Sequence, residues 1–236
     1  MLSKRSLWLL WLLASVLYIA VWLYPISDER TRLAGLALLP TIWFCLIGLL
    51  WSNRPIRLVL IGFTLIVGLF LAMPGRRHRD VTLLRNDYAA GLRRYTGVRY
   101  YWGGESPKGI DCSGLIRRGM IDALWIRGIL SADPELVRYG LWVWWNDCTA
   151  ADFGEGRGVT SRCFTVQSIN NLDHSRIQPG DLAVTTSGSH VMAYLGSNDW
   201  IEADPEVGKV ITESAPSAHN TWFSQNMNIV RWNILR

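Results

Sequence analysis

Cys112 is a cysteine capable of nucleophilic chemistry, and it directly follows a glycine-rich loop. Both lie in the stretch "YYWGGESPKGIDCSGLI", which runs from Tyr100 to Ile116. The glycines and the proline of this stretch are incompatible with a regular helix or strand. After Asp111 the apolar residues recur at helical spacing, which predicts Cys112 at the start of a helix. The N–H groups and dipole of a helix N-terminus favour the thiolate, the nucleophilic form of cysteine.

A thiolate nucleophile also needs a base with a third group that orients it. Of the four histidines, only His190 opens an apolar strand, "HVMAYLG". The strand that follows, "WIEAD", carries Glu202 and Asp204 on one face, because side chains alternate along a strand. The pattern therefore predicts Cys112 on a helix end, His190 on a strand and a carboxylate on the neighbouring strand.

The elements that must position these residues form two groups along the chain. "VTLLRNDYAAGLRRY" is an amphipathic helix, and another helix begins at Pro134 with Asp133 as its cap. The region 146–178 is expected to be irregular. After "QPGD" the apolar period changes to two, which predicts a series of short strands. Helices followed by an antiparallel meander indicate an α+β fold.

Three segments of this region resemble successive motifs of the NlpC-type cell-wall cysteine peptidases: "YYWGGESPKGIDCSGL", "QPGDLAVTTSGSHVMAYLG" and "WIEADP". The resemblance covers residues 82–215. It implies a papain-like fold, with helices packed on an antiparallel sheet. It also implies a hydrolase that cleaves peptide bonds in peptidoglycan stem peptides, commonly between D-glutamate and a diamino acid, or a related amidase.

Carried over by position, Cys112 matches the nucleophile of the family and His190 matches its base. Three residues near the thiol are implied to bind substrate or to help stabilise an oxyanion, and these are Tyr100, Asp111 and Ser113. Glu202 falls where the family usually has a third polar residue, most often a histidine. A carboxylate can accept a hydrogen bond from imidazole equally well, and Asp204 remains an alternative for this role.

Two other functions compete with wall hydrolysis. One is acyl transfer or thioester hydrolysis on lipids, as carried out by some membrane-bound relatives in the same superfamily. Those relatives typically place the histidine before the cysteine, whereas Cys112 precedes His190 here, which favours the wall enzyme. The other is a catalytically silent wall-binding module, which the intact cysteine and histidine disfavour.

The first third of the chain predicts a membrane region. Apolar runs at 7–26 and 33–51 are long enough to cross the hydrocarbon core as helices, and a shorter run at 57–73 is expected to form a third span. The first run is too long for the core of a cleaved signal peptide. We therefore expect a membrane-anchoring region at 1–80, built from two to three transmembrane helices, and a peptidase domain at 81–236.

Charge follows the same division. Residues 1–80 hold nine of the 24 Lys and Arg but three of the 19 Asp and Glu, so the net charge of +5 belongs to the membrane flanks. The basic stretch "PGRRHRD", at 74–80, is typical of contact with lipid headgroups. No basic face suggests a nucleic-acid partner. The spacing of Cys and His residues gives no metal site, and no cofactor is expected.

The positive-inside rule does not orient this chain, because basic residues flank both sides of the predicted spans. The expected substrate provides the orientation instead. Peptidoglycan lies outside the inner membrane, so we expect a multi-pass inner-membrane protein with its N-terminus inside and its peptidase domain on the outer, periplasmic side. In that oxidising compartment Cys148 and Cys163 are a candidate disulfide.

Overall fold

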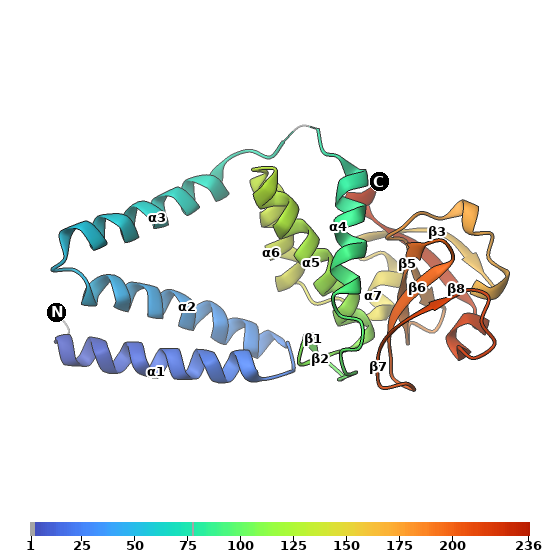
Figure 1. Cartoon of the computed structure of the whole chain (residues 1–236), viewed down its shortest axis with the longest axis horizontal. Helices are drawn as coiled ribbons and strands as arrows, with labels where there is room; N and C mark the ends of the chain where they lie inside the picture. The colour runs from blue at the N-terminus through green and yellow to red at the C-terminus, as the bar shows by residue number, and fades with distance from the viewer. Residues whose placement is uncertain (1–2, 77) are drawn as a thin grey trace.

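The computed structural model describes residues 3–76 and 78–236 and has two parts (Figure 1). Three long helices extend to one side, and these are α1 (Lys4–Leu23), α2 (Glu29–Leu49) and α3 (Arg54–Ala72). The later helices and the strands form a domain on the other side. The two parts meet at the end of α3 and at the turn between α1 and α2.

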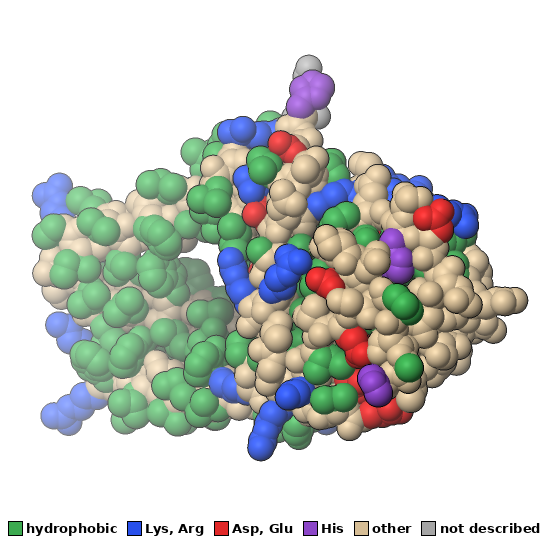
Figure 2. All heavy atoms as spheres, turned by 45° about the vertical axis from the view of Figure 1, so that its right-hand side comes forward, with side chains coloured by type: hydrophobic (Ala, Val, Ile, Leu, Met, Phe, Trp, Pro, Cys, Tyr) green, Lys and Arg blue, Asp and Glu red, His purple; other side chains and the backbone are tan. Residues whose placement is uncertain are grey.

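The three N-terminal helices are each long and apolar enough to cross a membrane. Their 19 to 21 residues correspond to about 30 Å of helix, the thickness of a hydrocarbon core. Figure 2 shows hydrophobic side chains over most of their visible surface. The third helix is longer than the apolar run because Asn53 caps it and Pro55 occupies its first turn.

The first helix ends three residues earlier than the sequence predicts, at Leu23. Pro25 explains the difference, because the residue before a proline is disfavoured in helical conformation. A short turn follows, and the Asp28 side chain then caps α2 by accepting a hydrogen bond from the N–H of Thr31 at 2.8 Å. This turn lies against the domain, whereas the turn between α2 and α3 lies at the far end of the helices (Figure 1).

The domain has the expected α+β architecture. Its helices are α4 (Val81–Arg93), α5 (Cys112–Leu130), α6 (Pro134–Trp145) and the short α7 (Ala150–Glu155). Helix α5 packs between α4 and α6 and also contacts the sheet at β5 and β6. A small hairpin, β1 (Glu105–Ser106) with β2 (Gly109–Ile110), precedes α5.

The main sheet has six antiparallel strands in the order β3-β8-β4-β5-β6-β7. The strands are β3 (Thr160–Val166), β4 (Leu182–Thr185), β5 (Val191–Gly196), β6 (Asp199–Asp204), β7 (Lys209–Ser214) and β8 (Met227–Trp232). The meander β4 to β7 was predicted, and β8 returns to pair with β4. The prediction that 146–178 is irregular was wrong, because α7 and β3 lie within it. Strand β3 is an edge strand in which only Thr160 is buried, so its sequence lacks the apolar alternation of a buried strand.

Both faces of the central strands are buried. On β5, Val191 and Ala193 join the core that α5 covers, together with residues such as Leu115. Met192 belongs to a second core on the opposite face, where Phe223 packs in a short 3-10 turn, Thr221–Ser224. His190 immediately precedes β5 and is itself buried, so the central strands of the sheet hold it in place.

Candidate active site

Cys112 is the first residue of α5, and Asp111 is its N-cap. The Asp111 Oδ1 atom accepts hydrogen bonds from the N–H of Gly114 at 2.7 Å and from the hydroxyl of Ser113 at 3.0 Å. These bonds hold the N-terminus of α5 in place, and a helix N-terminus favours the thiolate form of a cysteine. Asp111 and Ser113 thus make contacts within the chain, and their expected roles toward a substrate stay predictions.

The glycine-rich loop explains how backbone comes so close to the thiol. A Cβ atom at Gly104 would collide with the carbonyl oxygen of Gly109, and one at Gly114 would collide with that of Gly104. The loop is thereby packed directly on the first turn of α5. The N–H of Gly103 also donates to Asp111 Oδ2 at 2.7 Å, which joins the loop to the helix cap.

The base and its orienting carboxylate face each other on neighbouring strands. The register of β5 and β6 pairs Ala193 with Ile201, so His190 and Glu202 lie on the same face of the sheet. His190 Nε2 lies 2.5 Å from Glu202 Oε2, and both side chains are almost fully buried. This contact leaves Nδ1 as the imidazole nitrogen available to a thiol.

Asp204, the alternative third member, makes different contacts. Its Oδ1 accepts hydrogen bonds from the N–H groups of Glu206 at 2.6 Å and of Val207 at 3.1 Å, which closes the turn after β6. Glu202 is diagonal to His190 in the register and has the longer side chain, so it reaches the imidazole. In the structure Glu202, and not Asp204, is the carboxylate that contacts the base.

The environment of His190 favours its protonated form. Burial by itself lowers the pKa of His190, but hydrogen bonding to Cys112 and Glu202 and the negative charges of both residues raise it to about 9. An imidazolium next to a thiolate is the ion pair that an activated cysteine requires. The arrangement is suited to nucleophilic attack on an acyl carbon.

Two side chains complete the base half of the site, and the sequence analysis missed both. Asn220 Nδ2 donates to Glu202 Oε1 at 2.5 Å, and the Trp222 ring stacks on His190 with centroids 4.2 Å apart. Both belong to "HNTWFS", which has no strand or helix period. The only local signal is Asn220 as the cap of a 3-10 turn, and nothing in that signal points to the imidazole.

Tyr100 lies near the thiol, as the sequence predicts. The residue is half-buried, and burial together with the nearby charges of Cys112 and Asp111 raises the pKa of its hydroxyl. The hydroxyl therefore stays protonated and remains able to donate a hydrogen bond. Its expected role at an oxyanion stays a prediction.

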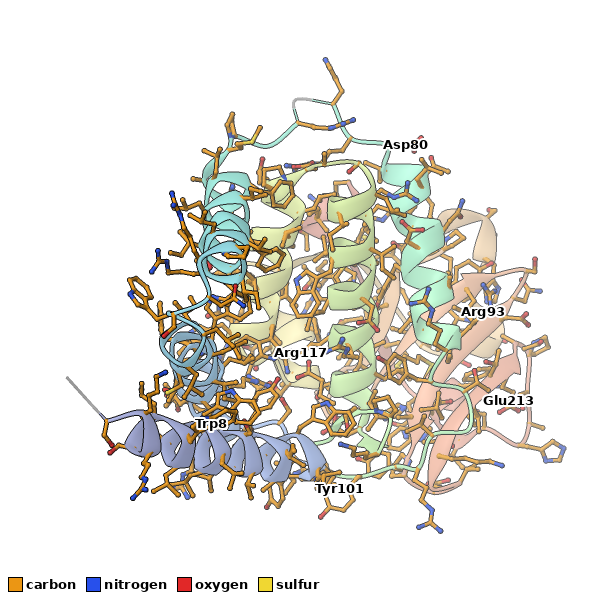
Figure 3. All side chains as sticks on the ribbon, turned by 60° about the vertical axis from the view of Figure 1, so that its left-hand side comes forward. Trp8, Asp80, Arg93, Tyr101, Arg117 and Glu213 are labelled. Atoms are coloured by element: carbon orange, nitrogen blue, oxygen red, sulfur yellow. The ribbon has the colours of Figure 1, made fainter. Side chains whose placement is uncertain are left out.

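Cys112 opens onto a cleft of about 400 Å³. Four segments form its walls. They are the glycine-rich loop with Gly103, the loop after α6 with Asp147, the β4–β5 turn with Ser189 and the α1–α2 turn with Ser27. Figure 3 shows Tyr101, on the glycine-rich loop, beside the end of α1. Among the described residues, no group of three His, Cys, Asp or Glu side chains could hold a metal ion.

The sequence profile of the NlpC/P60 family matches residues 97–231, more than half of the chain and all of the site. The chain belongs to the NlpC/P60 family. The three apolar helices α1 to α3 precede the matched region.

Individual proteins that the chain resembles share only a small part of its sequence. The chain is 26% identical over 121 residues to "Murein DD-endopeptidase MepS/Murein LD-carboxypeptidase" of Escherichia coli K12, covering 50% of this chain and 48% of the relative. It thus spans about half the length of that curated relative. Among solved structures, the peptidoglycan hydrolase RipB of Mycobacterium tuberculosis is 20% identical, with a TM-score of 0.42 and 71% and 76% coverage of this chain and of RipB. NlpC1 of Trichomonas vaginalis is 17% identical, with a TM-score of 0.41 and coverage of 67% and 47%.

The disulfide expected in this NlpC/P60 domain is not formed in the structure, where Cys148 and Cys163 are both free. Cys148 is buried beside the cleft, in the loop after α6, and burial raises the pKa of its thiol. Cys163 is exposed on the edge strand β3. A disulfide requires a specific distance and orientation between two cysteines, and the sequence does not specify either for this pair.

Proposed function

We propose that this protein is a membrane-tethered cysteine hydrolase that cleaves peptide bonds in the stem peptides of peptidoglycan. The observation that carries the proposal is Cys112 at the capped N-terminus of α5, next to the buried His190–Glu202 pair. Membership of the NlpC/P60 family supports it, as does the printed activity of the E. coli relative. The intact pair also argues against a catalytically silent module.

The reaction follows from this geometry. The Cys112 thiolate attacks the carbonyl carbon of the peptide bond, and the carbonyl electrons move to oxygen. The N–H of Cys112 and the hydroxyl of Tyr100 are the proposed donors to that oxyanion. The intermediate collapses, the C–N bond breaks, and the imidazolium of His190 gives its proton to the leaving amine. Glu202 holds the ring through its contact with His190 Nε2.

The second half of the reaction releases the acyl group. Neutral His190 takes a proton from water as the water attacks the thioester. The C–S bond breaks, which returns Cys112 as thiolate beside the newly formed imidazolium and frees a carboxylic acid. We propose a D-glutamyl–diamino acid bond, or the related amide bond, as the target. The name of the E. coli relative refers to other stem-peptide bonds, and these are the competing outcome of the test below.

The proposed location is the inner membrane, with the catalytic domain outside. Helices α1 to α3 are long and apolar enough for three crossings, and the α1–α2 turn and the domain lie at the same end of this helical region (Figure 1). An odd number of spans is consistent with that arrangement. A reporter fused after Arg236 tests the side of the domain. If only a reporter that works in the cytoplasm is active, the domain lies on the side of the membrane that has no peptidoglycan, and the proposal is contradicted.

The activity test uses the full-length protein in detergent micelles with purified muropeptides, and mass spectrometry of the products. We expect a new amine terminus from wild type and no product from Cys112→Ala. Cys163→Ala, a change at an exposed thiol on β3, is the matched control and should retain activity. Phospholipid vesicles form a second arm. Acyl transfer from phospholipid without muropeptide cleavage would replace the proposal with the lipid-directed alternative.

A further inference from the structure

The turn between the first two membrane helices contacts the catalytic loop directly. We name residues 24–28 the connector. Ile26 forms an antiparallel bridge with Gly104, and the N–H of Ser27 donates to the carbonyl oxygen of Gly103 at 2.9 Å. Ser27 is also part of the cleft wall at Cys112. The membrane region thus supplies backbone to the site itself.

A buried arginine holds the connector in this position. Arg32, near the start of α2, is 3% exposed. Its guanidinium donates to the carbonyl oxygen of Ser27 at 2.9 Å, to Glu105 Oε2 at 3.3 Å and to the carbonyl oxygen of Trp145 at 3.4 Å. One side chain therefore joins the connector, the β1–β2 hairpin and the end of α6. A buried charge without its partners is strongly destabilising, so these contacts keep Arg32 and the three segments together.

The ion pair continues to the nucleophile helix. Glu105 is 6% exposed, and its Oε1 lies 3.2 Å from Arg117 Nη1, on the second turn of α5. Arg117 also donates to Asp147 Oδ1 at 2.7 Å. Figure 3 shows Arg117 on α5, facing the side on which the membrane helices lie. Arg32, Glu105 and Arg117 are nearly fully buried, so solvent screens their mutual contacts weakly, whereas the side chain of Asp147 is largely exposed.

A second route of hydrogen bonds connects the connector with the cap of the same helix. The N–H of Ser27 donates to Gly103, and the N–H of Gly103 donates to Asp111. Asp111 in turn caps the helix that begins with Cys112. The position of the glycine-rich loop, and with it the environment of the thiol, is therefore linked to the membrane helices by two independent sets of contacts.

We propose that the connector is a structural part of the catalytic site and that Arg32 is a positioning residue, which fixes the glycine-rich loop against the first turn of α5 through Ser27 and Glu105. The catalytic consequence rests on the proposed function. Its effect on the Cys112 thiol does not, because thiol reactivity can be measured without a substrate.

The first test compares Arg32→Gln with Arg30→Gln in the full-length protein in lipid nanodiscs. Arg30 is an exposed residue of the same helix, so the control removes the same charge from the same membrane flank. We expect Arg32→Gln to lower kcat on the order of 10²-fold, with a smaller change in KM, because the loop is misplaced and binding groups remain. We also expect the pH midpoint of Cys112 alkylation by iodoacetamide to rise. Arg30→Gln should match wild type.

The second test changes no charge. Ser27→Pro removes the N–H that Gly103 accepts, while Ser27→Ala keeps it, and the extended bridge at Ile26 is compatible with a following proline. We expect the alkylation midpoint and kcat to change in Ser27→Pro more than in Ser27→Ala. Circular dichroism establishes which variants are folded, and if Arg32→Gln is not, the Ser27 pair decides.

Folded Arg32→Gln and Ser27→Pro proteins with wild-type kcat and a wild-type alkylation midpoint would overturn the proposal. A wild-type protein that cleaves no muropeptide would instead contradict the proposed function. In that case the alkylation midpoints still decide whether the connector controls the thiol.

Discussion

The two halves of the site are held in different ways. The base half lies on the sheet, where Glu202 and the ring of Trp222 contact His190 and Asn220 holds Glu202, all from the α+β domain. The nucleophile half lies at the junction with the apolar helices α1 and α2, where Gly103 contacts Ser27 of the connector. The base half is therefore held by contacts within the domain, whereas the nucleophile half also contacts the connector between α1 and α2.

This difference indicates which changes should disturb which function. Substitutions in the base half should alter proton transfer while the thiol environment keeps its helix cap. Substitutions at the connector should alter the thiol environment while the His190–Glu202 contact is kept. The following predictions test that separation from the base half, and the connector variants described above test it from the other side.

The largest effect is expected for Glu202→Gln. A neutral amide cannot stabilise the imidazolium of His190, so kcat should fall between about 10²- and 10⁴-fold while the fold is retained. The matched control is Asp204→Asn, two residues along the same strand, whose side chain closes the β6–β7 turn. Full activity of Glu202→Gln with loss in Asp204→Asn would assign the third role to Asp204.

The next effect concerns pH. The pKa of His190 is raised to about 9, so the proton donor for the leaving amine is lost above that pH, and kcat should fall about tenfold per pH unit there. The raised pKa has a matching effect on stability. The contribution of protonated His190 is complete below its ordinary pKa of 6.5 and is lost as the pH rises through about 9.

The measurements are the pH profile of turnover and the NMR titration of His190. Glu202→Gln and Cys112→Ala each remove one cause of the raised pKa, so the titration midpoint should move down in both. A midpoint near 6.5 in wild type would contradict the ion pair and with it the proposed form of the base.

A smaller effect is expected for Trp222→Leu. The stacked ring holds the imidazole plane, and such ring pairs contribute about 0.5–1.5 kcal/mol, which corresponds to roughly 2- to 10-fold in kcat. The Cys112 alkylation midpoint should change little, because the α5 cap is untouched. A large shift of that midpoint would break the separation of the two halves.

The smallest effect is expected for Cys163→Ser, which should leave turnover within about twofold of wild type, as is usual for an exposed position. The three domain cysteines also provide a direct readout. At neutral pH iodoacetamide should label Cys112 first, then Cys163, and last Cys148, whose pKa is raised by burial. Labelling of Cys148 before Cys112 would contradict an activated nucleophile.

Much of the fold could be predicted because its signals are local. The three apolar runs, the meander from β4 to β7 and the helix after Asp111 each follow from a period or a cap within a few residues. Strand β3 could not be predicted in this way. It is an exposed edge strand that exists because β8 pairs with it, and β8 lies some sixty residues further along the chain.

The sequence by itself predicts the proposed chemistry of this protein, because Cys112 at a helix start and His190 at a strand start are typical of a thiol nucleophile with its base. Tertiary structure decided which partners support them. Glu202 and Asp204 share a strand face, and only side-chain length and the contacts of the β6–β7 turn separate them. In the sequence Arg32 immediately precedes the predicted span 33–51, and only folding brings it to Glu105, because a contact across 73 residues has no local signature.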